Sequence, residues 1–328
     1  MEKAIREQFN EEVLIEGLKK FGVTLEESEL IGGFENMVYS FEKNGEKYVL
    51  RIAHSLHNSF DNIKAELEFI DYLAKNDAPV AVPIQSQSGN LVELLADKEP
   101  CFIATAFKFA KGERAKREHF MSPEFLQEYG KNIALMHKLA KDFKPEFKRH
   151  LFEDEEFVTR AQEFLPTEDY IIKEKLDQVL SQINLLEKNQ DNYGLIHTDV
   201  HAGNFFVDEN NQFTIFDFDD SCYKHFISDI AIVLFYAFYL VPDHKEGMAF
   251  TFKNVMKGYN EVNILPKSSI DNILLFLQLR TIIIYVVLNR SFDKDKRPEW
   301  VQKYIKMFRP RIIEDIPYVD LDFSSIEI

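Results

Sequence analysis

The stretch LIHTDVHAGNFFVDENNQFTIFDFDD, residues 195–220, sets Asp and His side chains among runs of Phe, Ile and Val. NFFV and FTIF have the aromatic and β-branched residues typical of strands, and the polar segment DENNQ between them is typical of a turn. Burying a carboxylate is costly unless a cation or a proton meets it. The stretch therefore predicts either a hairpin whose ends hold a metal or a charged ligand, or a surface hairpin.

Composition limits the classes of protein to consider. The chain has 328 residues, of which 45% are hydrophobic, enough for two lobes that each bury a core. Its formal net charge of −16 disfavours nucleic acid and anionic membranes as partners, whereas a cationic small molecule is tolerated. We therefore expect a small-molecule ligand and neither a nucleic-acid nor a membrane partner.

Cysteine content and hydropathy indicate a cytoplasmic protein. Cys101 and Cys222 are too few for a disulfide framework, which favours a reducing compartment. Residues 1–22 have the pattern of a charged amphipathic helix and lack the apolar core of a signal peptide. The longest apolar runs, near 230–241 and 281–288, are shorter than the roughly 20 residues of a membrane span, so we interpret them as core helices.

The pattern of the chain changes near residue 105. Residues 29–53 and 80–109 are typical of strands, residues 62–76 of a helix, and nearly everything after 112 is helical in period except the quoted hairpin. We predict an α+β fold in which a small antiparallel-sheet lobe precedes a larger, mainly helical lobe. The predicted boundary separates residues 1–105 from residues 106–328.

Two charged residues of the first lobe are predicted to face inward. On a helix over 62–76, Glu66 lies in the middle of the apolar stripe, where an unpaired carboxylate is costly. In the strand EKYVLRIA, alternation places Arg51 on the face opposite Leu50 and Ile52. Arg51 and Glu66 are therefore a candidate ion pair, although each could also reach solvent at the edge of its element.

The spacing of the quoted stretch suggests a metal site. Asn204 follows Asp199 by five residues, and Asp217 stands at the exit of the hairpin that Asn204 enters. Carboxylate and amide oxygens suit Mg²⁺, which keeps several waters and bridges substrate phosphates. Asn204 and Asp217 would share the cation, and Asp199 would remain to accept a proton from a hydroxyl, as in kinases.

The motifs resemble those of one enzyme superfamily. HTDVHAGN followed by IFDFDD is similar to the catalytic and metal motifs of the aminoglycoside phosphotransferase and choline kinase-like superfamily. IGGFENMVYSF with KYVLRIA resembles its first strands, and SDIAIVLF resembles the helix after its metal site. The resemblance covers roughly residues 29–240 and implies a protein kinase-like bilobal fold.

The resemblance also implies roles for individual residues. Asp199 matches the catalytic base, Asn204 and Asp217 match the metal ligands, and Arg51 with Glu66 matches the pair that positions the phosphates of the nucleotide. The implied cofactors are ATP, with GTP as the alternative nucleotide, and Mg²⁺.

Three further residues complete the nucleotide site that we predict. Gly33 belongs to the turn over the phosphates, and the backbone at Phe107 and Phe109 would bond the adenine. This chain departs from the superfamily pattern in having Arg51 where Lys is usual and Thr198 where Gly is common. Neither change removes a group that the chemistry needs.

Two further residues match structural positions of the superfamily. Asp229 matches the Asp that braces the catalytic loop, although an Asp at the start of an apolar helix could simply complement the helix dipole. His197 matches a structural His of the loop. Asp219 and Asp220 are left without an assigned role.

Other functions compete with the kinase interpretation. His197, Asp199 and His201 could form the cluster of a metal-dependent hydrolase, but Asn204 would then have no role. A protein Ser/Thr kinase of the same fold and a nucleotide-binding relative without turnover are further alternatives. Members of the superfamily phosphorylate aminoglycosides and amino alcohols, so we expect a small, possibly cationic acceptor with a hydroxyl, whose identity the sequence leaves open.

Overall fold

The computed structural model describes residues 8–33, 35–96, 100–241 and 243–328. The chain forms two compact units. Unit 1 comprises Met1–Glu113, Phe143–Arg149 and Phe205–Asp219, and unit 2 comprises Arg114–Asp142, His150–Asn204 and Asp220–Ile328. The stretch that decides the fold is therefore divided, because the predicted catalytic loop, residues 197–204, belongs to unit 2 and the hairpin belongs to unit 1.

Unit 1 is built on an antiparallel sheet with the strand order β1-β2-β3-β6-β4, in which β5 also pairs with β6. The strands are β1 (Ser28–Gly32), β2 (Met37–Lys43), β3 (Glu46–His54), β4 (Pro83–Ile84), β5 (Val92–Leu94) and β6 (Phe102–Lys108). Asn44 and Gly45 join β2 to β3 with φ of 56° and 77°. Both values are positive, as the predicted two-residue Asn-Gly hairpin turn requires.

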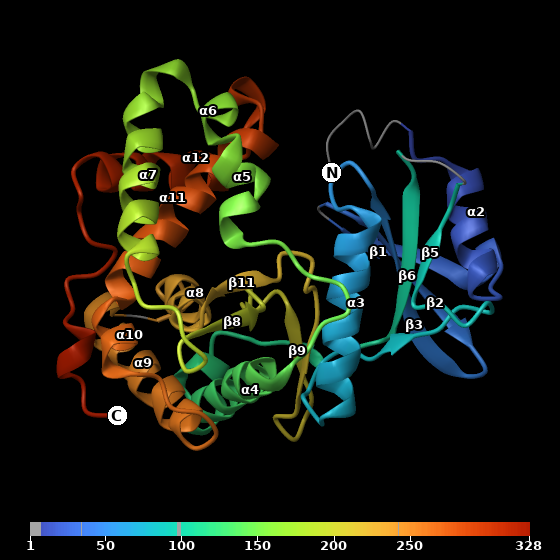
Figure 1. Cartoon of the computed structure of the whole chain (residues 1–328), viewed down its shortest axis with the longest axis horizontal. Coiled ribbons are helices and arrows are strands. Elements are labelled where there is room, and N and C mark those ends of the chain that lie inside the picture. Colours follow the sequence, from blue (N-terminus) through green and yellow to red (C-terminus); the bar gives the residue numbers. More distant parts are fainter. Residues whose placement is uncertain (1–7, 34, 97–99, 242) are drawn as a thin grey trace. The chain divides into compact units, whose positions relative to one another are not determined.

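Helices α2 (Glu11–Lys20) and α3 (Phe60–Lys75) lie on opposite faces of this sheet (Figure 1). Strand β3 supplies both faces, since Leu50 and Ile52 belong to the core cluster under α2, whereas Ala53 belongs to the cluster under α3. The alternation predicted for β3 is therefore confirmed. Arg51 points to the α3 side, where Glu66 is fully buried.

The predicted hairpin is also present in unit 1. Strand β9 (Phe205–Val207) pairs with β10 (Phe213–Ile215), with Phe205 opposite Ile215. The short strand β7 (Glu113–Arg114) adds to the β9 edge. Because Asn204 immediately precedes β9 and Asp217 closely follows β10, the hairpin brings the two ends of its chain back to the same side.

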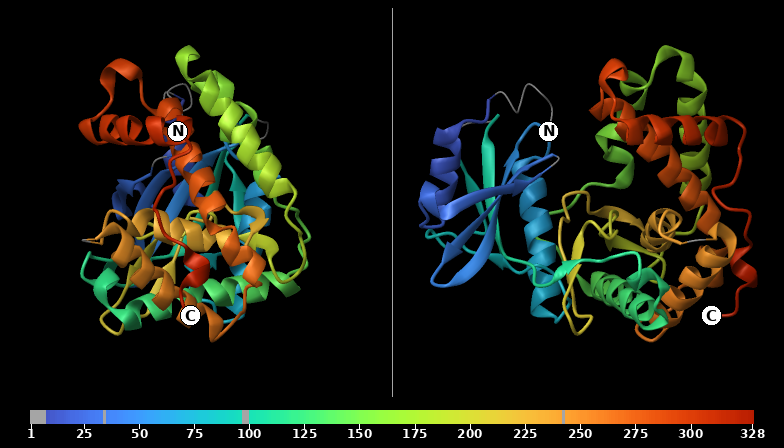
Figure 2. Two further views of the ribbon diagram at one scale, coloured as in Figure 1. Left: turned by 90° about the vertical axis from the view of Figure 1, so that its left-hand side faces the viewer. Right: turned by 180° about the vertical axis from the view of Figure 1, so that it is seen from behind.

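Unit 2 is mainly helical. Its α-helices are α4 (Pro123–Asp142), α5 (Glu156–Thr159), α6 (Ala161–Phe164), α7 (Tyr170–Asn184), α8 (Ile227–Ala237), α9 (His244–Asn260), α10 (Lys267–Asp271), α11 (Ile273–Ser291) and α12 (Glu299–Ile313). Helices α4 and α9 lie side by side in the views of Figures 1 and 2. Their backbones approach closely because each helix has a glycine at the contact, Gly130 in α4 and Gly258 in α9. A Cβ at Gly258 would lie 1.8 Å from the carbonyl oxygen of Gln127.

A two-stranded ribbon in unit 2 was not predicted. Strand β8 (Tyr193–Ile196) pairs antiparallel with β11 (Cys222–His225). Each strand has four residues, and Lys224 and His225 in β11 hide the alternation by which strands are predicted. The ribbon matters because β8 leads directly into the catalytic loop and β11 leads into α8.

Helix α11 differs from the expectation for apolar runs. Within the described part of the chain it is the one helix long and apolar enough to cross a membrane, with 19 residues and a mean hydropathy of 1.7. Of the residues in its most apolar window, 56% are buried, as in a core helix. The apolar run that we expected, residues 281–288, is only part of this helix. Its interpretation as a core helix agrees with the burial of α11.

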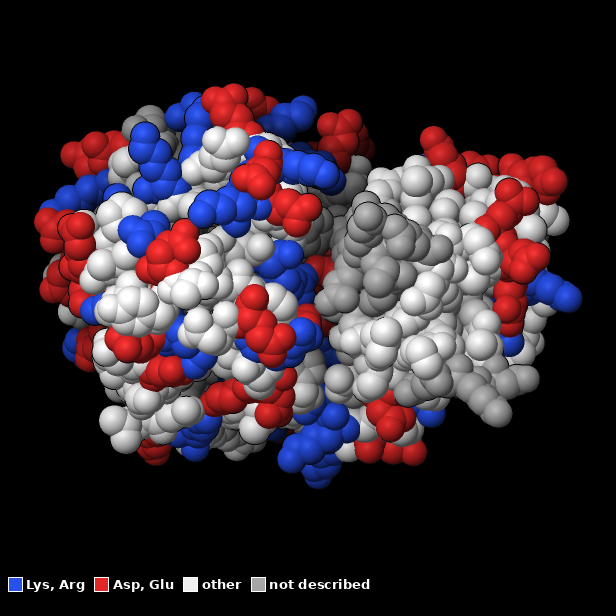
Figure 3. Space-filling model, turned by 90° about the horizontal axis from the view of Figure 1, so that it is seen from above, with Lys and Arg blue, Asp and Glu red and all other residues white. Residues whose placement is uncertain are grey.

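The charges of unit 2 are mixed. On the face shown at the left of Figure 3, basic and acidic side chains are interspersed. This face is therefore not uniformly acidic, despite the negative net charge of the chain. The charges on this face give no separate indication of a cationic ligand.

Candidate active site

The catalytic loop of unit 2 holds Asp199 through several contacts. The side-chain nitrogen of Asn204, Nδ2, donates to Asp199 Oδ2 at 3.0 Å and to the Asp199 carbonyl oxygen at 2.9 Å. His201 Nε2 lies 3.3 Å from the same Oδ2. Arg280 Nη2 donates to the other carboxylate oxygen, Oδ1. Asp199 thus has a fixed carboxylate, as a residue that orients a substrate requires.

Asp229 braces this loop from the first turn of α8. Its carboxylate is fully buried and accepts from the backbone N–H groups of Thr198 at 2.9 Å and His197 at 3.3 Å. His137 Nε2 lies 3.1 Å from Asp229 Oδ2, and His137 Nδ1 lies 2.9 Å from the Tyr259 hydroxyl. The carboxylate therefore does more than complement a helix dipole, because it ties the catalytic loop to α4 and α9.

The backbone conformation of Thr198 accounts for the glycine that is common at this position in the superfamily. Its φ is +63°, a left-handed conformation that is unfavourable for a β-branched side chain. Besides its N–H bond to Asp229, its hydroxyl donates to the Asp220 carbonyl oxygen at 2.6 Å. Strain of this kind persists where surrounding contacts over-determine the backbone, which is common at active sites. Asp220 thus contributes through its backbone.

Asp199 stays ionised because of its cationic neighbours. Burial by itself raises the pKa of the Asp199 carboxyl, but Arg280 and then His201 hold it well below its usual range. Arg280 also donates to the Tyr236 hydroxyl at 2.8 Å, and burial raises the pKa of Tyr236 to about 12, so that this hydroxyl remains protonated. Arg280 and Tyr236 were not predicted from the sequence. The signal that could have identified Arg280 is its position between the apolar segments ILLFLQL and TIIIYVVL of α11.

The Asn204 side chain is oriented as a metal ligand would require. Its amide nitrogen is engaged with Asp199, so the amide oxygen is the atom that remains to ligate a cation. Asp217, after β10 in unit 1, has a φ of +66°. A positive φ is uncommon for a non-glycine residue, although Asp tolerates it, and it often marks a functional position. The oxygen donors of these two residues fit Mg²⁺ chemically.

The predicted ion pair in unit 1 is confirmed. Arg51 Nη1 and Nη2 donate to the two carboxylate oxygens of Glu66 at 2.7 and 2.8 Å, with side-chain exposures of 7% and 0%. Arg51 Nε donates to Thr105 Oγ1 at 3.2 Å. Burial lowers the pKa of Arg51, but Glu66, Asp219 and Asp217 more than reverse this and raise it overall.

Asp219, which had no predicted role, extends this ion pair. Its carboxylate lies 3.8 Å from Arg51 Nη1 and 3.4 Å from His57 Nε2. It accepts from the amides of Asn58 at 3.1 Å and Asn36 at 3.3 Å. Burial raises the pKa of the Asp219 carboxyl, but the hydrogen bond from His57 and the charge of Arg51 lower it overall. Asp219 is therefore a second anion, beside Glu66, that lies next to the Arg51 guanidinium.

The other predicted nucleotide-binding residues lie in unit 1. Gly33 has a φ of +120°, and a Cβ there would lie 1.9 Å from the carbonyl oxygen of Asn36, so this turn requires glycine. Phe107 is the next-to-last residue of β6, and its ring centroid lies 5.4 Å from the Arg51 guanidinium carbon. The N–H of Phe109 donates to the Lys47 carbonyl oxygen at 3.0 Å. The backbone group of Phe109 that remains to bond an adenine, as predicted, is therefore its carbonyl oxygen.

The hydrolase alternative gains no support from the geometry. Among the residues that the structure describes, no group of three or more His, Cys, Asp or Glu side chains is arranged to hold a metal. His197 Nδ1 instead accepts from the Asp199 N–H at 3.3 Å, which is the structural role that the resemblance implies.

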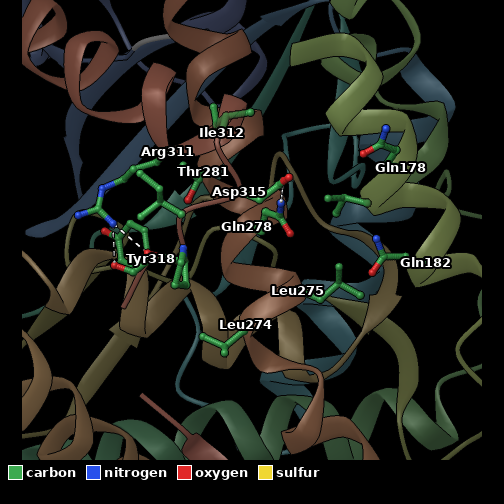
Figure 4. Close-up of a pocket in the computed structure, with 13 residues that line it drawn as sticks. Gln178, Gln182, Leu274, Leu275, Gln278, Thr281, Arg311, Ile312, Asp315 and Tyr318 are labelled. Atoms are coloured by element: carbon green, nitrogen blue, oxygen red, sulfur yellow. Dashed lines mark hydrogen bonds between the residues drawn. The ribbon is translucent and has the colours of Figure 1, made fainter. Parts of the chain in front are cut away.

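Unit 2 also has a hollow of about 430 Å³ between α7, α11, α12 and the chain that follows α12 (Figure 4). Gln178, Gln182 and Gln278 contribute polar groups, and Leu274, Ile312 and Tyr318 contribute apolar ones. Gln278 bonds Asp315 at 3.4 Å within this wall. None of the predicted site residues lines the hollow, so it is separate from Asp199.

An Asp held on a braced loop, an Asn whose side-chain nitrogen is bonded to that Asp and an inward Arg–Glu pair are the features of a phosphotransferase of the protein kinase-like fold. Comparison with known proteins agrees. The profile of the "Phosphotransferase enzyme family" matches residues 26–249. The chain belongs to this family.

Several relatives are small-molecule kinases. The chain is 32% identical over 333 residues to amicoumacin kinase of Bacillus subtilis (strain 168), covering 99% of this chain and 98% of that protein. It is 26% identical over 207 residues to a homoserine kinase of Neisseria meningitidis serogroup B, covering 62% and 63%. A solved structure of the amicoumacin kinase hAmiN, in complex with AMP-PNP, Ca²⁺ and Ami, has a TM-score of 0.93 at 26% identity and full coverage of both chains.

These comparisons confirm the predicted superfamily, the α+β kinase-like fold and the enzyme class, a phosphotransferase with an alcohol group as acceptor. A microcompartment-associated aminopropanol kinase shares the fold with a TM-score of 0.73 at 18% identity and coverage of 92% of this chain and 97% of that chain.

Proposed function

We propose that the protein is an ATP- and Mg²⁺-dependent kinase that transfers the γ-phosphate to a hydroxyl of amicoumacin or of a similar small molecule. The similarity to amicoumacin kinase over 99% of the chain supports this acceptor class. The amino alcohols and aminoglycosides of the wider superfamily are the acceptors to test next. We also propose a cytoplasmic location, which the presence of only two cysteines in the chain supports.

Asp199 is the catalytic base in this proposal. It would accept a hydrogen bond from the acceptor hydroxyl and align the oxygen with the γ-phosphorus. Because Arg280 and His201 lower the pKa of its carboxyl, Asp199 is ionised at neutral pH and takes the proton only as the new P–O bond forms. The fixed orientation of the carboxylate is the observation that carries the proposal.

Asn204 and Asp217 are the residues that would hold Mg²⁺. The amide oxygen of Asn204 and the carboxylate of Asp217 are hard oxygen donors of the kind that the ion prefers. When bound, the ion would neutralise charge on the phosphate oxygens during transfer. The nucleotide and Ca²⁺ in the hAmiN complex support the use of a nucleotide and a divalent cation.

Residues 1–105 would bind the nucleotide, and residues 106–328 would carry the catalytic loop and the acceptor site. Arg51 would contact the phosphates, with Glu66 and Asp219 holding its guanidinium in place. Gly33 would let the β1–β2 turn approach the phosphates, and Phe107 and Phe109 would present the backbone to the base of the nucleotide.

A direct assay tests the proposal. The purified full chain is incubated with γ-labelled ATP and Mg²⁺, and with GTP in parallel, against amicoumacin, spectinomycin, aminopropanol, choline, homoserine and a generic protein acceptor. We expect transfer of the label to a small hydroxyl compound and loss of transfer in Asp199→Asn. Transfer to the protein acceptor alone would overturn the small-molecule assignment, and unchanged transfer by Asp199→Asn would overturn the role of Asp199.

A further inference from the structure

Arg280, on α11 of unit 2, makes contacts that are concentrated on the catalytic base. A single nitrogen, Nη2, donates to both Asp199 Oδ1 and the Tyr236 hydroxyl, the latter at 2.8 Å. The guanidinium also lies over the Tyr236 ring, with its central carbon 5.4 Å from the ring centroid. Helices α8 and α11 pack together (Figure 1), so Arg280 joins the packed helix pair to the catalytic loop.

The other side of the guanidinium lacks comparable bonds. Arg280 Nε is buried and has no hydrogen-bond partner among the described residues. An arginine retained only for the stability of the fold is expected to satisfy its buried donors, because an unsatisfied buried donor is unfavourable. Among the described residues, the hydrogen bonds of the Arg280 guanidinium therefore go to Asp199 and Tyr236.

A second cation lies beside it. Arg280 and Lys224 both line a cavity of about 20 Å³, together with Thr198, which is large enough for one water and too small for an acceptor. The Lys224 ammonium lies 3.6 Å from the centroid of the Phe152 ring, and burial, which is the main cause, lowers its pKa to about 8. The charge of Arg280 contributes to this lowering, so the two cations are close enough to interact.

We propose that Arg280 is a positioning residue for the reaction: it holds the Asp199 carboxylate in the orientation in which the remaining lone pairs meet the acceptor hydroxyl. This inference rests on the proposed function. Asn204 and His201 hold one carboxylate oxygen from the loop itself, and Arg280 holds the other from α11. Without Arg280 only one of the two carboxylate oxygens is held, so the carboxylate rotates more easily about its last side-chain bond.

The test compares arginine variants of α11 in the full-length protein. Arg280→Gln removes the charge and the bond to Asp199, whereas Arg280→Lys keeps the charge on a shorter side chain. Arg290→Gln is the matched control, because Arg290 is also a mostly buried arginine of α11 but pairs with Glu156 at 3.1 Å. Tyr236→Phe removes only the hydroxyl partner of Arg280.

We expect Arg280→Gln to lower kcat by about 10–100-fold, the effect of misplacing a reacting group, with the KM for ATP and the affinity for AMP-PNP nearly unchanged. Arg280→Lys should recover part of the rate, Tyr236→Phe should lower kcat by a smaller factor, and Arg290→Gln should keep the parent rate. If Arg280→Gln does not fold, Arg280→Lys and Tyr236→Phe still show whether kcat falls while the KM for ATP stays nearly unchanged.

A parent-like kcat in Arg280→Gln would overturn the inference, as would an equal loss in Arg290→Gln or a change confined to KM. If the parent phosphorylates none of the acceptors, its slow hydrolysis of ATP, with water as the acceptor, gives the same comparison of kcat. A parent without either activity would refute the proposed function, and that outcome is distinct from a failure of the Arg280 variants in an active enzyme.

Discussion

Breaking the Arg51–Glu66 pair should separate the stability of unit 1 from the nucleotide binding that we propose for it. Glu66→Gln keeps the size of the side chain but leaves the Arg51 charge buried at 7% exposure, without its bidentate partner at 2.7 and 2.8 Å. Removing one partner of a buried pair costs about 3–5 kcal/mol of unfolding free energy. Because Asp219 remains 3.8 Å from Arg51, we expect about 3 kcal/mol, the lower end of that range.

The measurement is the free energy of unfolding in urea without ligand, monitored with a probe that reports on unit 1. Asp71→Asn is the matched control, since Asp71 is on the same helix and pairs with the exposed Lys75. Its loss should cost about 0.3–0.5 kcal/mol, as for exposed pairs on helices. A cost for Glu66→Gln no larger than that of the control would refute the reasoning, because the pair would then behave as if it were exposed to water.

The double variant Arg51→Met with Glu66→Met sharpens the test. Replacing both members of a buried ion pair by apolar residues is often neutral or stabilising, so most of the lost stability should return. The affinity for AMP-PNP should not return, because the cation proposed to contact the phosphates is absent. A double variant that bound AMP-PNP as tightly as the parent would show that Arg51 is only structural.

Three further outcomes are expected. Asp199→Asn should lower kcat by about 10²–10⁴-fold with AMP-PNP affinity nearly intact, as steady-state kinetics and calorimetry can measure. Asp217→Ala should remove the dependence of AMP-PNP affinity on Mg²⁺, and calorimetry that found no such dependence in the parent would contradict the metal assignment. Burial, as the main cause, lowers the pKa of His225 to about 4, so the neutral form stabilises the fold. That contribution is complete above about pH 6.5 and is lost as the pH falls toward 4, so His225→Phe should flatten the acid side of the stability profile measured by urea unfolding.

The elements of unit 1 could be predicted because their signals are local. Alternation in β3 separates Arg51 from Leu50 and Ile52, and helical period places Glu66 in the apolar stripe of α3. Once both charges are predicted to face the same interior, the cost of an unpaired buried charge makes their pairing the favourable solution.

Arg280 and Asp219 show where such prediction stops. Arg280 reaches Asp199 across 81 residues of sequence, and no local period relates the two positions. Asp219 is adjacent to Asp220 in the sequence, yet its partners, Asn36, Asn58 and His57, come from the other end of unit 1. Contacts of this kind are decided by tertiary packing, and only the presence of a charge in an apolar segment indicates that a partner exists.

The way in which two of these carboxylates are neutralised also bears on the chemistry. Asp199 and Asp219 each lie beside an arginine, and both have a pKa below the usual range despite burial. An Asp199 carboxylate that holds its proton so weakly can orient a hydroxyl but cannot deprotonate it in advance. That property suits phosphoryl transfer through a loose transition state, in which the acceptor oxygen loses its proton late and catalysis depends mainly on position. A residue that fixes the position of Asp199 should therefore matter to the rate more than one that raises its basicity.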